Sequence, residues 1–204
     1  MQEGVLSLMQ MAKISAALGR LRAEVPGVSL AVEVTDSRQM RHEADWPVRW
    51  DSGHPDIRAV ESPEELYSAP AVKLLARAGV RDPDVFAKMV SGALEGLAEA
   101  THSSYSGLVE ISAAGVTKAA GLAWLCERYR LTASDVIAFG DMPNDVPMLT
   151  WAGHAVAVAN AHRAVLAIAD DVAATNEEDG VAGYLEYLFP AEPIEFPAEP
   201  IEPT

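Results

Sequence analysis

The second half of the chain alternates short apolar segments with segments of helical periodicity, and this order leaves few folds open. The apolar segments VIAF and HAVAV are nearly free of polar residues, as in strands covered on both faces of a sheet. Strands joined through a helix run parallel. We therefore predict a parallel α/β sheet with helices on both faces. Its predicted elements are helix 117–130, strand 135–139, helix 143–151, strand 154–158, helix 161–168, strand 171–174 and helix 180–188.

The first half has a different order, in which strands follow one another without a helix between them. The turn at Asp36-Ser37 separates two extended segments and indicates a hairpin. This order predicts a small α+β domain with an antiparallel sheet. Its predicted elements are helix 9–24, strand 28–35 with the hairpin return, loop 45–63, strand 71–77 and helix 82–98, followed by two short strands or one bent strand within 100–112.

The chain is thus predicted to have three regions: the α+β domain at 1–107, the parallel sheet at 108–189 and a tail at 190–204. The tail contains AEPIE twice and too few apolar residues to build a core, so we expect it to be disordered.

Charge and hydrophobicity exclude several classes of function. The chain carries 30 acidic and 15 basic residues, for a net charge of −15. It has no basic cluster of the kind that nucleic-acid binding requires. No apolar segment approaches the ~20 residues that span a membrane, and the start of the chain lacks the basic region of a signal peptide. We expect a cytoplasmic protein whose single cysteine, Cys126, fills the core.

The segment with the most chemical content is DVIAFGDMPNDVPML, residues 135–149. A buried strand ends at Gly140-Asp141, and Asn144-Asp145 follow at the start of the next helix. Open α/β sheets bind ligands at the carboxyl ends of their strands, and Mg²⁺ prefers carboxylate oxygens. A lysine such as Lys118, at an earlier helix start, can neutralise phosphate oxygens. Together these groups predict part of a phosphoryl-transfer site.

Each of these groups has a structural alternative when it is taken alone. Asp141 could cap the following helix, and Lys118 could be a solvated helix residue. Residues 176–179 could simply cap the last helix. Only the joint order and spacing of the three segments favours a functional site.

The run from Leu108 to Leu188 resembles the C-terminal part of the Rossmann-like core of haloacid dehalogenase (HAD) superfamily phosphatases, in the Cof-like, sugar-phosphate phosphatase subfamily. The segments that carry this resemblance are LVEISAAGVTKAAGL, VIAFGDMPNDVPMLTWAGHAVAVANA and ATNEEDGVAGYLEYL. Such enzymes are phosphoric monoester hydrolases. The resemblance implies Mg²⁺-dependent hydrolysis of small phosphorylated metabolites, most of all sugar phosphates, through an aspartyl-phosphate.

The resemblance also implies roles for four residues. Lys118 would bind phosphate and steady the nucleophile, so it is both catalytic and substrate-binding. Asp141 would hold Mg²⁺ as a catalytic residue, and Asn144 would contact phosphate. Asp145 would support the metal.

Cof-like enzymes carry an α+β cap domain that selects the leaving group, and residues 9–105 resemble such a cap in size and element order. The loop 45–63 and nearby polar or aromatic residues are candidates for substrate contact. An equally good alternative is that they close the core of the cap or face solvent. The candidates are His42, Trp46, Trp50, His54, His102, Ser103 and Ser104.

The sequence departs from the family in one respect. The opening D-x-D-G-T motif, whose first aspartate is the nucleophile, is absent, and so is the second motif. Asp82-Pro83-Asp84 has the D-x-D spacing, but it precedes a helix and follows no buried strand. We therefore expect this polypeptide to be inactive on its own, because covalent catalysis needs its nucleophile.

The absence of the opening motif also implies an incomplete sheet, and it leaves functions other than catalysis open. A parallel sheet without its central strands has unpaired edges, and these favour self-association. The alternative function is a non-catalytic, degenerate HAD-like module that binds a phosphorylated ligand or a protein partner. A nucleotide-binding or receiver-like domain is a third reading, although the chain has no glycine-rich phosphate loop.

Overall fold

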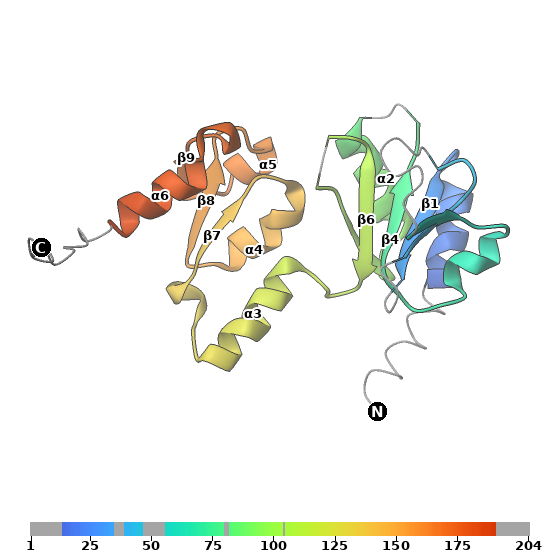
Figure 1. The fold of residues 1–204 in the computed structure, drawn as a ribbon, viewed down its shortest axis with the longest axis horizontal. Helices are drawn as coiled ribbons and strands as arrows, with labels where there is room; N and C mark the ends of the chain where they lie inside the picture. Colours follow the sequence, from blue (N-terminus) through green and yellow to red (C-terminus); the bar gives the residue numbers. More distant parts are fainter. Residues whose placement is uncertain (1–13, 35–38, 47–55, 80–81, 104, 191–204) are drawn as a thin grey trace, which may run out of the picture.

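The computed structural model describes residues 14–34, 39–46, 56–79, 82–103 and 105–190. Two β-sheets organise this part of the chain, and Figure 1 shows them as separate units joined by the segment between β6 and α3.

The first sheet has six strands in the order β3-β2-β1-β4-β6-β5. Neighbouring strands are antiparallel except for β2 and β3, which are parallel. The strands are β1 (Ser29–Val34), β2 (Met40–His42), β3 (Ile57–Ala59), β4 (Ala71–Arg77), β5 (Ala98–Thr101) and β6 (Leu108–Ala113).

Two helices cover one face of this sheet because alternate strand residues turn their apolar side chains toward it. Residues 14–24 are helical, and α2 spans Pro83–Ala93. The fully buried Leu21 and Phe86 from these helices share one core with Leu30 of β1. On the opposite face, Trp46 packs against Ala31 and Leu75.

The predictions for this half are confirmed for the two central strands, the hairpin and the two short strands. The prediction of a loop at 45–63 was wrong in its second part, because β3 pairs with β2 and a 3₁₀ helix, η1, follows at Pro63–Tyr67. Residues 47–55 lie outside the described part. Helix α2 also ends earlier than predicted, because Gly96 takes a φ of +74° and turns the chain into β5.

The second sheet consists of three parallel strands in the order β7-β8-β9, as predicted for this half. They are β7 (Ile137–Gly140), β8 (His154–Val158) and β9 (Asp171–Ala173). The helices are α3 (Lys118–Tyr129), α4 (Val146–Trp151), α5 (Arg163–Leu166) and α6 (Gly180–Leu188), and short 3₁₀ turns are η2 (Ala133–Asp135), η3 (Pro143–Asp145) and η4 (Asn176–Glu178).

Helices lie on both faces of this sheet. Ala138 of β7 shares a core with Leu149 of α4 and Val165 of α5. The next strand residue, Phe139, contacts the Tyr184 ring of α6, with ring centroids 5.6 Å apart. Since successive strand residues point to opposite faces, α6 covers the face opposite α4 and α5. Cys126 is buried, in agreement with its prediction as a core residue.

Several boundaries in this half differ from the prediction. β7 begins at Ile137 instead of residue 135, because η2 occupies 133–135 and is closed by Asp135, which accepts from the Thr132 amide at 2.8 Å. The predicted helix at 143–151 begins as η3, and the helix predicted at 161–168 is reduced to α5.

The link between the two sheets is short. β6 pairs with β4 and β5 in the first sheet, so the passage to the second sheet lies after Ala113 and not at the predicted division after residue 107. Four residues, 114–117, separate β6 from α3, and Gly115 among them takes a φ of +79°. The division into domains stays a prediction, with its boundary moved to this link.

No helix in the described ranges is both long and apolar enough to cross a membrane. The predicted tail at 190–204 lies outside those ranges except for Pro190.

The start of α6 generates a stability prediction. A Cβ on Gly180 would lie 1.9 Å from the carbonyl oxygen of Ala174, which is backbone and cannot rotate away. We expect Gly180→Ala to lower the free energy of unfolding by at least the ~1–3 kcal/mol typical of overpacking, measured by urea denaturation.

Gly183 in the same helix provides the matched control, because a Cβ there meets nothing within 4 Å. Gly183→Ala should raise stability by up to ~1 kcal/mol, since alanine favours a helix over glycine. Equal effects of the two substitutions would contradict the proposed crowding at Gly180.

Candidate functional site

The candidate site lies at the carboxyl end of β7, where the chain turns through Asp141 to Asp145 into α4. The loops that follow β8 and β9 end at the same edge of the sheet, because the three strands are parallel. The geometry therefore gathers three successive loops at one place, as expected for ligand sites in open α/β sheets.

Asp145 is the buried centre of the first loop, with only 3% of its surface exposed. One of its carboxylate oxygens, Oδ1, accepts a hydrogen bond from Lys118 Nζ. The other, Oδ2, accepts from the backbone amides of Asp141 and Met142 at 3.0 and 3.2 Å. These donors compensate the burial of the charge, and they fix the loop and the lysine relative to each other.

Lys118 is the first residue of α3, and the helix start is fixed by Thr117, whose hydroxyl accepts from the Ala120 amide at 3.1 Å. The Lys118 side chain remains 50% exposed although Nζ is paired with Asp145. An ammonium group has three donors, so Lys118 can bind an anion and Asp145 together.

Asp141 is not a helix cap, so the structural alternative raised for it by the sequence is wrong. Met142 occupies the cap position of η3, and Asp145 precedes α4. Within the described residues, no hydrogen bond or ion pair reaches the Asp141 carboxylate. Its backbone oxygen accepts from the His162 amide at 2.7 Å, which holds the residue in place. The carboxylate is therefore available to a cation.

Asn144 supplies a second oxygen. Its Oδ1 atom is buried and has no hydrogen-bond partner among the described residues. A buried oxygen without a hydrogen-bond partner is stabilised when a donor or a cation binds to it. Together, the Asp141 carboxylate and Asn144 Oδ1 fit the preference of Mg²⁺ for oxygen ligands. Asp145 already accepts from three protein donors, so its role at a metal stays a prediction.

Gly140 makes the tight packing of this loop possible. A Cβ at this position would lie 2.7 Å from the Cβ of Asp145 and 2.9 Å from Leu149 Cδ1. Only glycine therefore allows the buried carboxylate to lie directly against the end of β7.

The segment that begins at Asn176 is held at the same carboxyl edge of the sheet by hydrogen bonds to Asn160, a residue that the sequence analysis did not select. The Asn160 side chain, two residues after β8, accepts from the Asn176 amide at 3.1 Å and donates to Glu177 at 3.2 Å. Its position just after a predicted strand was the signal that could have identified it.

A cleft of about 410 Å³ lies between the two units. The first unit contributes residues from α2 and from the end of β5, and the second contributes Pro143, beside Asn144, and the start of α5. The ionisable residues that line it are Asp84, Lys88, His102, His162 and Arg163. Sequence reasoning selected only His102 from this set.

The other candidates for substrate contact divide between the core and the surface of the first unit. Trp46 is buried under Arg77, whose guanidinium lies 5.5 Å from the indole centroid. His42 is buried and its Nδ1 lies 2.8 Å from the Glu43 carbonyl oxygen. Both residues thus serve the core.

Ser103 donates to Glu110, which also pairs with Lys73. Burial opposes ionisation of Glu110, but these two donors outweigh it and lower its pKa. Trp50, His54 and Ser104 lie outside the described residues.

Comparison with known proteins agrees with this fold. A Streptococcus mutans structure superposes with a TM-score of 0.77 at 22% identity, covering 89% of this chain and 69% of its own. The 5-amino-6-(5-phospho-D-ribitylamino)uracil phosphatase YitU of Bacillus subtilis is 45% identical over 82 residues, which are 40% of this chain and 30% of that enzyme. The phosphoglycolate phosphatase of Methanopyrus kandleri is 39% identical over 114 residues, 52% of this chain and 47% of that enzyme.

The matched part of the chain thus spans less than half of the length of either of these two curated relatives. The sequence profile of the haloacid dehalogenase-like hydrolases matches residues 49–185, which is more than half of the chain. The protein therefore belongs to the haloacid dehalogenase-like hydrolases, in agreement with the resemblance of its second half to Cof-like phosphatases.

Proposed function

We propose that this chain provides the metal- and phosphate-binding part of a phosphatase that acts on phosphate monoesters of small metabolites, with sugar phosphates as the substrate class. The observation that carries the proposal is the arrangement around Asp145, which holds Lys118 beside the loop that bears Asp141. The curated relatives act on a phosphorylated ribityl compound and on phosphoglycolate, as their names state.

In this proposal Asp141 holds Mg²⁺ at the end of β7, and Asp145 supports the metal through the loop. The unpaired Oδ1 of Asn144 is a further oxygen for the metal, and the phosphate contact predicted for Asn144 stays a prediction. Bound Mg²⁺ would neutralise charge on the phosphate oxygens. Lys118 binds a phosphate oxygen through the donors that Asp145 leaves free, and it places a positive charge where negative charge develops in the transition state. The half-exposed position of the lysine supports this role.

We propose that the polypeptide alone does not turn over substrate. Asp82 caps α2 by accepting from the Val85 amide at 3.0 Å, and Asp84 is engaged by His102, His162 and Arg163. Neither aspartate follows a strand at the edge of the parallel sheet where Asp141 lies. This position supports the conclusion that neither Asp82 nor Asp84 is the nucleophile. The second candidate function is a module that binds a phosphorylated ligand without hydrolysing it, and Lys118 beside the Asp141 loop would serve that function equally well.

We further propose that the chain self-associates through the surface formed by α3 and β7. Trp124, Leu125 and Tyr129 of α3 are 60%, 44% and 70% exposed. β7 pairs only with β8 among the described strands, so its other edge is open. Exposed apolar surface next to an open strand edge promotes association. A cytoplasmic location accords with the unpaired Cys126.

Mg²⁺ binding tests the metal assignment. Asp141→Asn keeps the shape of the residue but removes its charge, so we expect the affinity for Mg²⁺ to fall at least tenfold, a loss of about 1.4 kcal/mol or more, by isothermal titration calorimetry. Glu186→Gln is the matched control, because Glu186 is exposed on α6 and carries the same charge. An unchanged affinity in Asp141→Asn would disprove the assignment.

Activity and phosphate binding test the second part of the proposal. With Mg²⁺, the wild-type chain should bind inorganic phosphate, and Lys118→Ala should weaken this binding because the ammonium group is lost. The same wild-type chain should not hydrolyse p-nitrophenyl phosphate above background. Hydrolysis that is abolished by Asp141→Ala would show that the chain is an active enzyme by itself.

Sedimentation velocity tests self-association. We expect the wild-type chain to form dimers or larger species whose fraction rises with concentration, and the double variant Trp124→Ser, Tyr129→Ser to be mainly monomeric. Tyr187→Ser removes an aromatic side chain that is 80% exposed on α6 and should leave association unchanged. A monomeric wild-type chain would contradict the proposal.

A further inference from the structure

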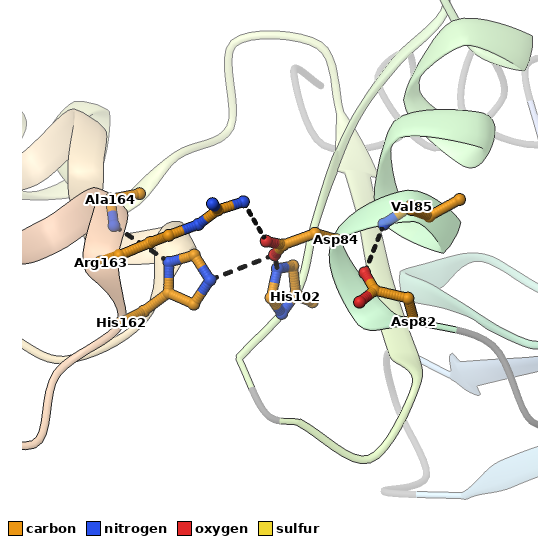
Figure 2. A network of polar contacts seen from close by, with 7 residues as sticks. All are labelled: Asp82, Asp84, Val85, His102, His162, Arg163 and Ala164. Carbon is orange, nitrogen blue, oxygen red and sulfur yellow. Dashed lines mark hydrogen bonds and ion pairs between the residues drawn. The ribbon is translucent and has the colours of Figure 1, made fainter.

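A cluster of two histidines and one aspartate lies where the two units meet, and the proposed phosphatase function does not use it. Asp84 is in the first turn of α2, His102 follows β5, and His162 precedes α5 of the second unit. Figure 2 shows both imidazole rings directed at the Asp84 carboxylate. Oδ1 of Asp84 lies 3.1 Å from Nε2 of each histidine.

Both histidines are almost fully buried, with exposed fractions of 3% for His102 and 7% for His162. Their rings meet edge to face, with centroids 5.7 Å apart. One nitrogen from each ring and one carboxylate oxygen lie within 4.8 Å of one another. Three potential ligand atoms from three separate segments thus lie close together.

Two of the three separations between the ligand atoms are close to those of a tetrahedral site. Zinc binds histidine nitrogen and carboxylate oxygen at about 2.0–2.2 Å, which places neighbouring ligands roughly 3.3–3.5 Å apart. The two nitrogen–oxygen separations of 3.1 Å need only small adjustments to reach this value. Three protein ligands leave the fourth position of a tetrahedron to water.

The chemistry of the ligands separates this cluster from the loop at Asp141. Imidazole suits zinc and other transition metals, whereas carboxylate and carbonyl oxygens suit Mg²⁺. We propose that Asp84, His102 and His162 form a second metal site, for Zn²⁺ or a similar transition-metal ion, which fastens the first unit to the second.

Arg163 supports this arrangement without occupying the ligand atom. Its guanidinium donates to the other oxygen of Asp84, Oδ2, at 3.0 Å. This contact stabilises the ionised carboxylate, which is the form that binds a metal.

The backbone of α5 provides a signature of metal binding. The Ala164 amide donates to His162 Nδ1 at 3.2 Å, so the proton of the neutral ring lies on Nε2 in the metal-free arrangement. A metal on Nε2 displaces that proton, and the neutral ring then carries its proton on Nδ1. The Ala164 amide must then lose its acceptor.

Calorimetric titration of the full chain with Zn²⁺, with excess Mg²⁺ present to occupy the Asp141 loop, tests the proposal. We expect one zinc per chain. Asp84→Asn, His102→Gln and His162→Gln should each weaken binding more than about tenfold, the lower end of the loss seen for groups that only support a ligand. His154→Gln is the control, because His154 also contacts an aspartate, Asp171, at 3.2 Å but is partly exposed.

Cobalt provides an independent measurement. Co²⁺ in the wild-type chain should give the strong visible absorption of a four-coordinate site, and Zn²⁺ should displace it. A weak, six-coordinate spectrum that is unchanged in His162→Gln would place the ion elsewhere and overturn the proposal.

The wild-type chain gives a test that does not depend on the folding of any variant. Zinc should shift the imidazole ¹⁵N resonances of His102 and His162 and the amide resonance of Ala164, and leave His154 unchanged. A shift confined to His154, or the absence of any zinc binding, would show that the cluster is only a set of hydrogen bonds.

Discussion

The buried carboxylate of Asp145 joins three parts of the second unit at one point: the start of α3, the end of β7 and the turn into α4. Both of its oxygens are engaged, by Lys118 and by two backbone amides. Removing a partner of a buried charge leaves that charge uncompensated and is strongly destabilising. The position of Lys118 and the need for Gly140 both follow from this one group.

The sequence predicted those features that local patterns determine. Strands 71–77 and 154–158 were placed at their observed bounds, and Lys118 and the loop were selected, because periodicity and short motifs specify them. The pairing of β2 with β3 and the contact of Asp84 with His162 were not predicted. The latter residues are 78 positions apart, and no local pattern records such a contact.

The two proposed metal sites differ in what they require of the fold. The loop at Asp141 belongs to one unit and uses oxygen atoms that β7 and α4 position within a few residues. The cluster at Asp84 draws on both units, so it is complete only while they are in contact. A metal at the Asp141 loop would act in phosphate chemistry. A metal at the Asp84 cluster would instead fix the positions of α2 and α5 relative to each other.

The four-residue link between β6 and α3 affects how strongly the contact at Asp84 can hold the two units together. Within the described residues, the backbone passes between the two sheets only there. Such a short tether holds the units at a high effective concentration, in the millimolar range for flexible linkers. Hydrogen bonds of about 1 kcal/mol each, far too weak to join free proteins, then contribute appreciably to holding the units together. Gly115 in the link, at a φ of +79°, can take up backbone conformations that other residues rarely adopt.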